Sequence, residues 1–139
     1  MKIRIKLDDF AIMPIRAHRT DAGLDICTPH LLDLPAHGSV TINTGVHVEL
    51  PPGTVGMLKS KSGLNIKKGI TSEGVIDEGY TGAIAVKLYN NSNVDAWFKA
   101  GDKISQLVIL PVVIPEEIEV VKELESTERG NNGFGSSGR

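Results

Sequence analysis

The residues of this chain that could do chemistry gather in five short segments, each combining glycine with polar or charged side chains between apolar stretches. Taken singly, each segment has an ordinary structural explanation. Asp102 can be a turn residue, and Lys61 can be a solvated charge that protects a strand edge. The five segments read DAGLDIC at 21–27, KSGL at 61–64, GVIDEGYTG at 74–82, GDKISQL at 101–107 and RGNNGFGSSGR at 129–139.

In this order and with this spacing, the segments resemble the five motifs of the trimeric dUTP pyrophosphatase family, and they span residues 21–139. The resemblance implies an all-β, jelly-roll-like barrel that forms a homotrimer. It also implies Mg²⁺-dependent hydrolysis of dUTP to dUMP and pyrophosphate, which limits uracil incorporation into DNA and supplies dUMP for dTMP synthesis. We expect a barrel domain over residues 1–128 and a flexible, glycine-rich lid over residues 129–139.

The segment from Gly74 to Asn90 is typical of a β-hairpin with residues 77–80 at its turn. Backbone N–H and C=O groups beside such a turn can recognise the flat edge of a ligand. The resemblance implies that main-chain atoms of Val75, Ile76 and Ala85 read uracil. Cytosine would leave buried groups unpaired there, at a cost of about 1–3 kcal/mol each.

Two residues of the turn match the reacting part of the family's site. Asp77 matches the catalytic aspartate of the family. A carboxylate beside a phosphate can accept a proton from an attacking water and orient it. Tyr80 matches the aromatic residue that packs under the deoxyribose, where its ring would reject ribonucleotides. The structural alternative for Asp77 is a turn residue that hydrogen-bonds to its own backbone. The structural alternative for Tyr80 is an aromatic side chain that only covers part of the hairpin surface.

The phosphate contacts depart from the family pattern at one position. Lys61, Ser62 and Gly63 match the segment that grips the phosphates, and Gln106 matches a glutamine that contacts phosphate. Lys61 stands where the family usually has arginine, so a point charge replaces a planar fork. Thr71 is a second departure, since many members carry an asparagine there that helps to read the base.

Asp25 matches the aspartate of the first motif, which holds magnesium through water. Mg²⁺ prefers to keep several waters and to bind substrate phosphates, so no all-protein cage is needed. Four histidines and one cysteine at irregular spacing give no zinc pattern. We therefore expect Mg²⁺ as the metal. The structural alternative is that Asp25 is an ordinary polar residue at the end of a strand.

The C-terminal segment has the composition of a disordered tail but contains a phenylalanine, which flexible linkers rarely carry. By resemblance, Arg129 contacts the triphosphate and Phe134 stacks on the uracil. Gly135 and Ser136 offer donors to the phosphates. This segment is expected to become ordered only when substrate is present.

The composition excludes several classes of protein. The formal net charge of −2 does not fit a general nucleic-acid or membrane-surface binder. The longest apolar run, residues 107–115, is far shorter than the roughly 20 residues of a membrane span. The N-terminus lacks the apolar stretch of a signal peptide, and the single Cys27 cannot form an intrachain disulfide. We expect a cytoplasmic protein, or one of the host cytoplasm if the chain is phage-encoded.

Short runs with a period of two predict an all-β fold. They lie at residues 2–7, 40–50, 84–88 and 94–98. A strand buried on both faces is expected over residues 104–113, and a last short strand at residues 118–121. Residues 62–68 are expected to form one short helix with Ser62 as its N-cap.

Two other functions compete with dUTP hydrolysis. A dCTP deaminase of the same fold would need a carboxylate on the return strand of the hairpin, where this chain has Lys87. A dUTP-sensing regulatory protein, as in phage members of the family, would bind a partner protein. The chain carries no extra insert that could serve as a partner surface.

Overall fold

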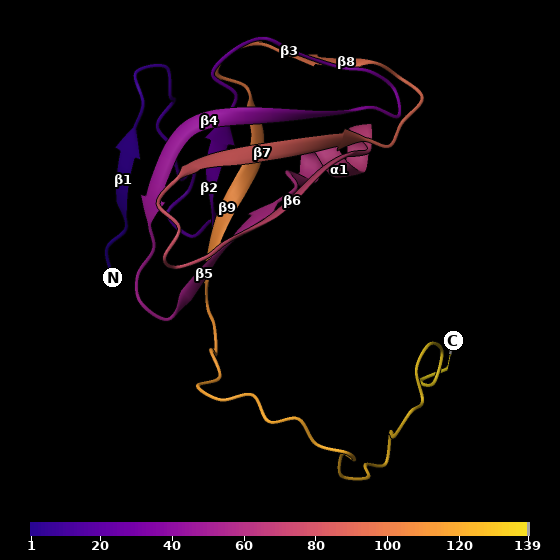
Figure 1. Cartoon of the computed structure of the whole chain (residues 1–139). Helices are drawn as coiled ribbons and strands as arrows, with labels where there is room; N and C mark the ends of the chain where they lie inside the picture. Colours follow the sequence, from indigo (N-terminus) through magenta and orange to yellow (C-terminus); the bar gives the residue numbers. More distant parts are fainter. Residues whose placement is uncertain (139) are drawn as a thin grey trace.

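The all-β prediction is confirmed: the computed structural model describes residues 1–138 and contains nine strands and one short helix (Figure 1). Some of these strands coincide with the alternating segments of the sequence, and others lie outside those segments. The elements are β1 Arg4–Leu7, β2 Gly23–Cys27, β3 Leu32–Leu34, β4 Ser39–Glu49, β5 Thr54–Lys59, α1 Ser62–Lys68, β6 Ile70–Ile76, β7 Ala83–Asn90, β8 Ala96–Phe98 and β9 Lys103–Pro111.

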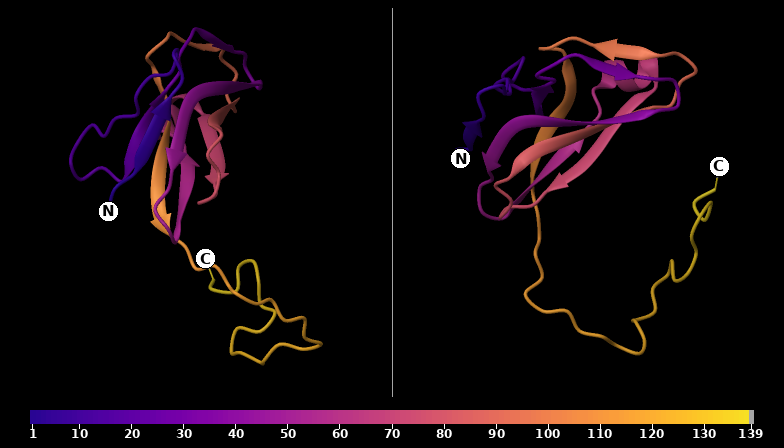
Figure 2. Two further views of the ribbon diagram at one scale, coloured as in Figure 1. Left: turned by 60° about the vertical axis from the view of Figure 1, so that its left-hand side comes forward. Right: turned by 45° about the horizontal axis from the view of Figure 1, so that its top comes forward.

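Seven strands form one antiparallel sheet in the order β1-β4-β7-β6-β5-β9-β2, and β3 pairs with β8 in a separate ladder. The large sheet curls into an open half-barrel, as Figure 2 shows from two further sides. Its two edge strands, β1 and β2, do not pair with each other, so the barrel does not close. The β3–β8 ladder covers one end of the curl (Figure 1).

The core lies on the concave side of the curl, where β4 and β7 each place alternate side chains. Ile42, Val46 and Val48 are buried on β4, and the even-numbered residues 84–88 are buried on β7. The alternation predicted for these two segments is therefore confirmed. Burying one apolar face contributes roughly 1.5–3 kcal/mol for each large side chain and fixes the register.

The end of the chain does not form the strands that the sequence predicted. β9 stops at Pro111, and only its first half is buried, so the expectation of a strand buried on both faces over residues 104–113 is wrong in its second half. Residues 118–121 form no strand, and Ile118 and Val120 are exposed. Apolar alternation forms a strand only beside a sheet edge, and residues 118–121 pair with no edge among the described residues.

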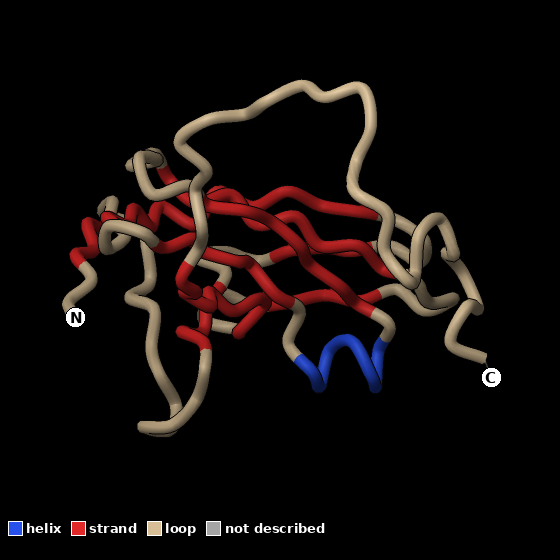
Figure 3. Tube along the Cα trace, turned by 90° about the horizontal axis from the view of Figure 1, so that it is seen from below, coloured by secondary structure: helices blue, strands red, loops and turns tan. Residues whose placement is uncertain are grey.

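Two smaller expectations also need correction. Val94 lies outside β8 and is exposed, so only Ala96 and Phe98 of that alternation belong to a strand. α1 is confirmed over Ser62–Lys68, but its N-cap is Lys61 and no side chain caps it. Ser62 is already the first helical residue, whereas an N-cap residue has extended backbone. Figure 3 shows α1 projecting from one side of the strands.

Residues 112–128, the arm, and residues 129–138, the tail, leave the sheet altogether (Figure 1). The arm carries exposed Val112, Val113, Ile114, Ile118, Val120, Val121 and Leu124. An apolar run of this length is unusual on the surface of a monomer.

Candidate functional site

A buried carboxylate with two ammonium partners forms the best-defined polar cluster. Asp25 lies in β2 and is 5% exposed. One carboxylate oxygen bonds to Lys61 Nζ, and the other lies 2.8 Å from Lys103 Nζ. Strand β2 pairs with β9, and this pairing brings Lys103 beside Asp25. The sequence prediction named Asp25 and Lys61 separately, but it did not anticipate their contact or the role of Lys103.

The electrostatics of this cluster favour a charged Asp25. Burial alone disfavours the carboxylate, but hydrogen bonds from Lys103 and Lys61 outweigh it, and the pKa of Asp25 is lowered. The same contact raises the pKa of Lys103. Burial raises the pKa of the nearby Cys27 thiol, so this residue packs as a small apolar side chain.

Gln106 faces Asp25 across the β2–β9 ladder and completes the cluster. Its amide nitrogen donates to the Ser60 carbonyl at 3.0 Å, which gives this partly buried amide its partner. Gly23 leaves the space for Gln106, because a Cβ at residue 23 would lie 2.7 Å from Gln106 Oε1. Substitution of Gly23 would therefore displace the glutamine.

A buried pair of serines connects the strands next to this cluster through hydrogen bonds, and the sequence analysis did not identify it. Ser72 Oγ lies 2.8 Å from Ser105 Oγ, and Ser105 also donates to the Lys59 carbonyl at 3.1 Å. Ser60 Oγ accepts from the Ser72 backbone N–H at 2.9 Å. These bonds join β6, β9 and the segment that leads into Lys61. The available signal was Ser105 within the strand predicted for residues 104–113, whereas Ser72 lies outside the predicted strands.

Ser62 and Gly63 begin α1 directly after Lys61, and both are exposed. A Cβ at Gly63 would meet no atom within 4 Å, so the backbone there is open to a ligand. Lys61, Ser62, Gly63, Gln106 and Asp25 therefore occupy one region of the molecule.

The turn after β6 is held by several contacts. Tyr80 N–H donates to the Asp77 carbonyl at 3.0 Å, and Tyr80 Oη donates to the Ala83 carbonyl at 3.0 Å. Glu78 accepts from the Gly53 N–H at 2.8 Å. Gly82 is required beneath the tyrosine ring, because a Cβ there would lie 2.4 Å from Tyr80 Oη. The exposed Asp77 is thus carried on an ordered turn.

The hairpin splays open next to this turn. β6 and β7 pair only from Ile70↔Asn90 to Ser72↔Leu88, after which β6 pairs with β5 on its other edge. Val75 and Ala85 therefore lie on strands whose facing edges do not pair with each other, although Ile76 is buried. Thr71 lies in the paired part, where it accepts from Asn91 at 3.2 Å.

The phosphate region and the turn lie apart within one chain. Lys59, two residues before Lys61, pairs with Glu73, and Asp77 is four residues further along from Glu73. At roughly 3.3 Å per residue, Asp77 is roughly 13 Å from that point.

Of the four predicted tail residues, Arg129, Gly135 and Ser136 form hydrogen bonds within the tail. Arg129 Nε donates to the Asn132 carbonyl at 3.1 Å, and Ser136 N–H donates to the Gly133 carbonyl at 3.0 Å. Phe134 is fully exposed, and Gly135 has a φ of 79°. Within residues 1–138, no hydrogen bond joins the tail to the sheet. Arg139, the last residue of the predicted lid, lies outside the described residues.

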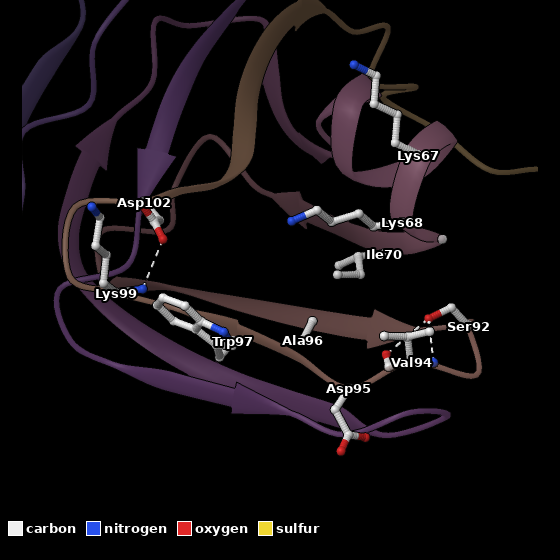
Figure 4. Close-up of a pocket in the computed structure, with 11 residues that line it drawn as sticks. Lys67, Lys68, Ile70, Ser92, Val94, Asp95, Ala96, Trp97, Lys99 and Asp102 are labelled. Atoms are coloured by element: carbon white, nitrogen blue, oxygen red, sulfur yellow. Dashed lines mark hydrogen bonds between the residues drawn. The ribbon is translucent and has the colours of Figure 1, made fainter.

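A cavity of about 690 Å³ lies at the C-terminal end of α1. Figure 4 shows Lys67 and Lys68 on one side of it and Trp97 and Lys99 on another. None of the predicted site residues lines this cavity. Among residues 1–138, no helix is long and apolar enough to cross a membrane.

Comparison with known proteins gives a consistent answer. A deoxyuridine 5'-triphosphate nucleotidohydrolase of Clostridium acetobutylicum is 44% identical, covering 99% of this chain and 96% of that protein. The dUTPase of Staphylococcus bacteriophage 80alpha, a G164S mutant solved with dUpNHpp, has a TM-score of 0.90 at 33% identity and 99% coverage of both chains. The same phage protein is described as controlling transfer of virulence genes.

A D95N mutant of the dUTPase from phage phi11 of S. aureus, described for its structural Mg(II) ion, has a TM-score of 0.79 at 30% identity and covers 91% of this chain and 100% of that one. The family model named dUTPase matches residues 9–138. On the length of this match and the identity to its relatives, the chain belongs to the dUTPase family.

Proposed function

We propose that this chain hydrolyses dUTP to dUMP and pyrophosphate at a site built from the Asp25 cluster, the turn carrying Asp77 and the tail. The observation that carries this proposal is the splayed hairpin. It leaves backbone edges free beside Asp77, while a separate region presents Lys61, Gln106 and open backbone at Gly63.

The free backbone edges suit uracil. Val75 and Ala85 are exposed on the stretches of β6 and β7 that do not pair with each other, so their N–H and C=O groups can bond to the edge of a base. Thr71 lies away from this opening and bonds to Asn91. Uracil recognition therefore falls to main-chain groups at residues 75, 76 and 85, and Tyr80 packs under the deoxyribose.

The phosphates bind at the other region. Lys61 and Gln106 supply a cation and an amide, and Ser62 and Gly63 supply a hydroxyl and open backbone. The ammonium of Lys61 bonds to Asp25 before substrate arrives, and Lys103 remains on the other oxygen when Lys61 turns to the triphosphate. Lys103 thus keeps the buried carboxylate compensated, since an unpaired buried charge is costly.

Mg²⁺ fits this donor set as a metal held by water and substrate. Among residues 1–138, no three His, Cys, Asp or Glu residues gather into a metal cage. Asp25 would hold the ion through water once Lys61 has moved, and the ion would supply positive charge beside the triphosphate.

The reaction is an attack of water on the α-phosphorus. Asp77 accepts a proton from that water and orients it, and pyrophosphate leaves on the opposite side. Lys61, Gln106 and Arg129 stabilise the negative charge that develops on the phosphate oxygens. Phe134 stacks on the uracil, while Gly135 and Ser136 close over the phosphates as part of the lid.

A homotrimer would unite the two regions of the site. Asp77 and Lys61 lie at opposite ends of β5 and β6 in one chain, and the arm exposes apolar side chains without a partner among the described residues. A second copy that presents its turn to the phosphate region of the first accounts for both observations. Light scattering should show a trimer, and a fully active monomer would contradict the assembly.

The test of function is pyrophosphate release measured across dUTP, dCTP, dTTP and UTP. Hydrolysis confined to dUTP supports backbone recognition of uracil and exclusion of the 2′-hydroxyl. Release from dCTP or dTTP at a comparable rate would contradict the reading of the base. Ammonia release from dCTP would indicate a deaminase, although Lys87 lies on β7 with its Nζ 5.2 Å from the Tyr89 ring centre and offers no carboxylate.

A further inference from the structure

The C-terminal side of the Asp77 turn is held by a side chain from a distant strand. His47 Nδ1 lies 2.8 Å from the Thr81 carbonyl oxygen. On the other side of the ring, His47 Nε2 lies 3.2 Å from Asp8 Oδ1. One imidazole thus connects the segment after β1 with the turn that carries Asp77 and Tyr80.

The strand register explains this position. His47 follows the irregularity in the β4–β7 ladder and pairs with Ala83, the first residue of β7. On the other edge of β4 it pairs with Lys6 of β1. The ring therefore lies between β1 and the last residues of the turn, where its side chain is 18% exposed.

The two contacts impose a requirement on the protons of the ring. A carbonyl oxygen can only accept, so Nδ1 must carry the hydrogen that bonds to Thr81. An ionised carboxylate also only accepts, so Nε2 must carry a hydrogen as well. Both contacts exist together only in the doubly protonated imidazolium form.

We propose that His47 is a positioning residue for the catalytic turn, and that Asp8 orients its ring toward Thr81. The proposal rests on the proposed role of Asp77. His47 touches neither substrate nor the reacting atoms. It acts by fixing the backbone between Tyr80 and β7, and through that backbone the direction of Asp77 and the tyrosine ring.

The other charges around the ring do not replace either contact. Arg4 and Glu49 line the same small cavity as His47 and form an ion pair with each other. Lys6, the cross-strand neighbour on β1, carries no acceptor and competes with His47 only for Asp8. In the turn, Glu78 bonds to Gly53, and Asp77 and Tyr80 are the remaining titratable side chains.

Two substitutions separate the contacts of His47. An asparagine amide nitrogen stands near the position of Nδ1, so His47→Asn can still donate to Thr81. A glutamine amide nitrogen stands near Nε2, so His47→Gln can reach only Asp8. We expect His47→Gln and His47→Ala to lower kcat for dUTP about tenfold and to raise the relative rate with UTP, because small misplacements of reacting groups are costly. His47→Asn should lose less than threefold.

Each outcome bears on the proposal. Equal losses for His47→Asn and His47→Gln, or unchanged kcat in His47→Ala, would overturn it. Melting curves on all variants identify a loss that follows stability alone, which would also overturn it. Asp77→Asn belongs in the same series: if it is active, the role of Asp77 fails, and if it is inactive while His47→Gln is active, only the role of His47 fails.

Discussion

The sheet and the C-terminal residues of this chain differ in strand pairing and in the burial of their apolar side chains. Residues 4–111 pair nearly every strand with a neighbour and bury a continuous apolar core. The arm and tail, residues 112–138, contain no strand or helix, and their apolar side chains face solvent. We infer that the part of the proposed site on the sheet, the organised half, is in place before substrate binds. The part in the tail depends on contacts that the isolated chain does not make.

In the organised half, the polar groups of the proposed site already have hydrogen-bond or ion-pair partners. Asp25 has two ammonium partners, Gln106 has its carbonyl, and the Asp77 turn is bonded to Gly53 and His47. No buried side-chain nitrogen or oxygen of the described residues lacks a hydrogen-bond partner. Phe134 is the contrasting case, because it is an aromatic residue with its whole ring in solvent.

Changing the catalytic carboxylate should have the largest effect, since it removes chemistry from the organised half. Asp77→Asn should lower turnover by about 10²–10⁴-fold, because a neutral amide cannot accept the proton of water. The turn should persist, since the backbone bond from Tyr80 to Asp77 does not use the carboxylate. Single-turnover pyrophosphate release, with binding of a non-hydrolysable dUTP analogue as control, measures this. Wild-type turnover would contradict the assignment.

Removing the tail should cost less turnover and almost no stability. Deleting residues 129–139 should lower turnover by more than tenfold, which corresponds to more than about 1.4 kcal/mol of transition-state stabilisation, because the lid no longer excludes water. The melting temperature should hardly change, since no described tail residue bonds to the sheet.

Phe134→Ala is the matched control for that deletion. It should give a smaller loss, limited by a stacking contribution of about 1–3 kcal/mol. Full activity after deletion would make the tail a linker, and unfolding would make it a structural strand. Either result would remove the contrast between the two halves.

The sequence predicted the parts of the molecule that depend on local pattern. Alternation identified β4 and β7, and glycine-rich motifs identified the Asp77 turn and Lys61. It could not predict contacts between distant strands, such as Lys103 with Asp25 or His47 with Thr81, because they depend on register. It also predicted a strand at residues 118–121, since alternation does not reveal whether a partner edge exists.

Removing the Lys61 ammonium should harm phosphate binding in the organised half by about tenfold. Lys61→Ala leaves Lys103 on Asp25, so the carboxylate stays compensated and the fold should persist. The loss should fall mainly on KM for dUTP, and Lys61→Arg should keep or improve activity because its fork can bind phosphate at two points. Unchanged kinetics in Lys61→Ala would mean that the residue is only a solvated charge.

The smallest effect should be on stability in acid. Because the two lysines outweigh burial and lower the pKa of Asp25, its ionised form stabilises the native state. This contribution is complete above the unfolded pKa of about 3.9 and is lost as the pH falls through the lower native pKa. Asp25→Asn should therefore melt below wild type at pH 7 by an amount that shrinks as the pH falls below 4.

Glu73→Gln is the control, because the Lys59–Glu73 pair is exposed and contributes about 0–1 kcal/mol. Melting curves at fixed protein concentration separate the two cases, since assembly also raises the melting temperature. A difference for Asp25→Asn that persists undiminished at pH 3 would mean that the carboxylate acts through packing rather than charge. The organised half would then owe its order to the sheet alone, and Lys61 would be free to bind phosphate without first leaving a partner.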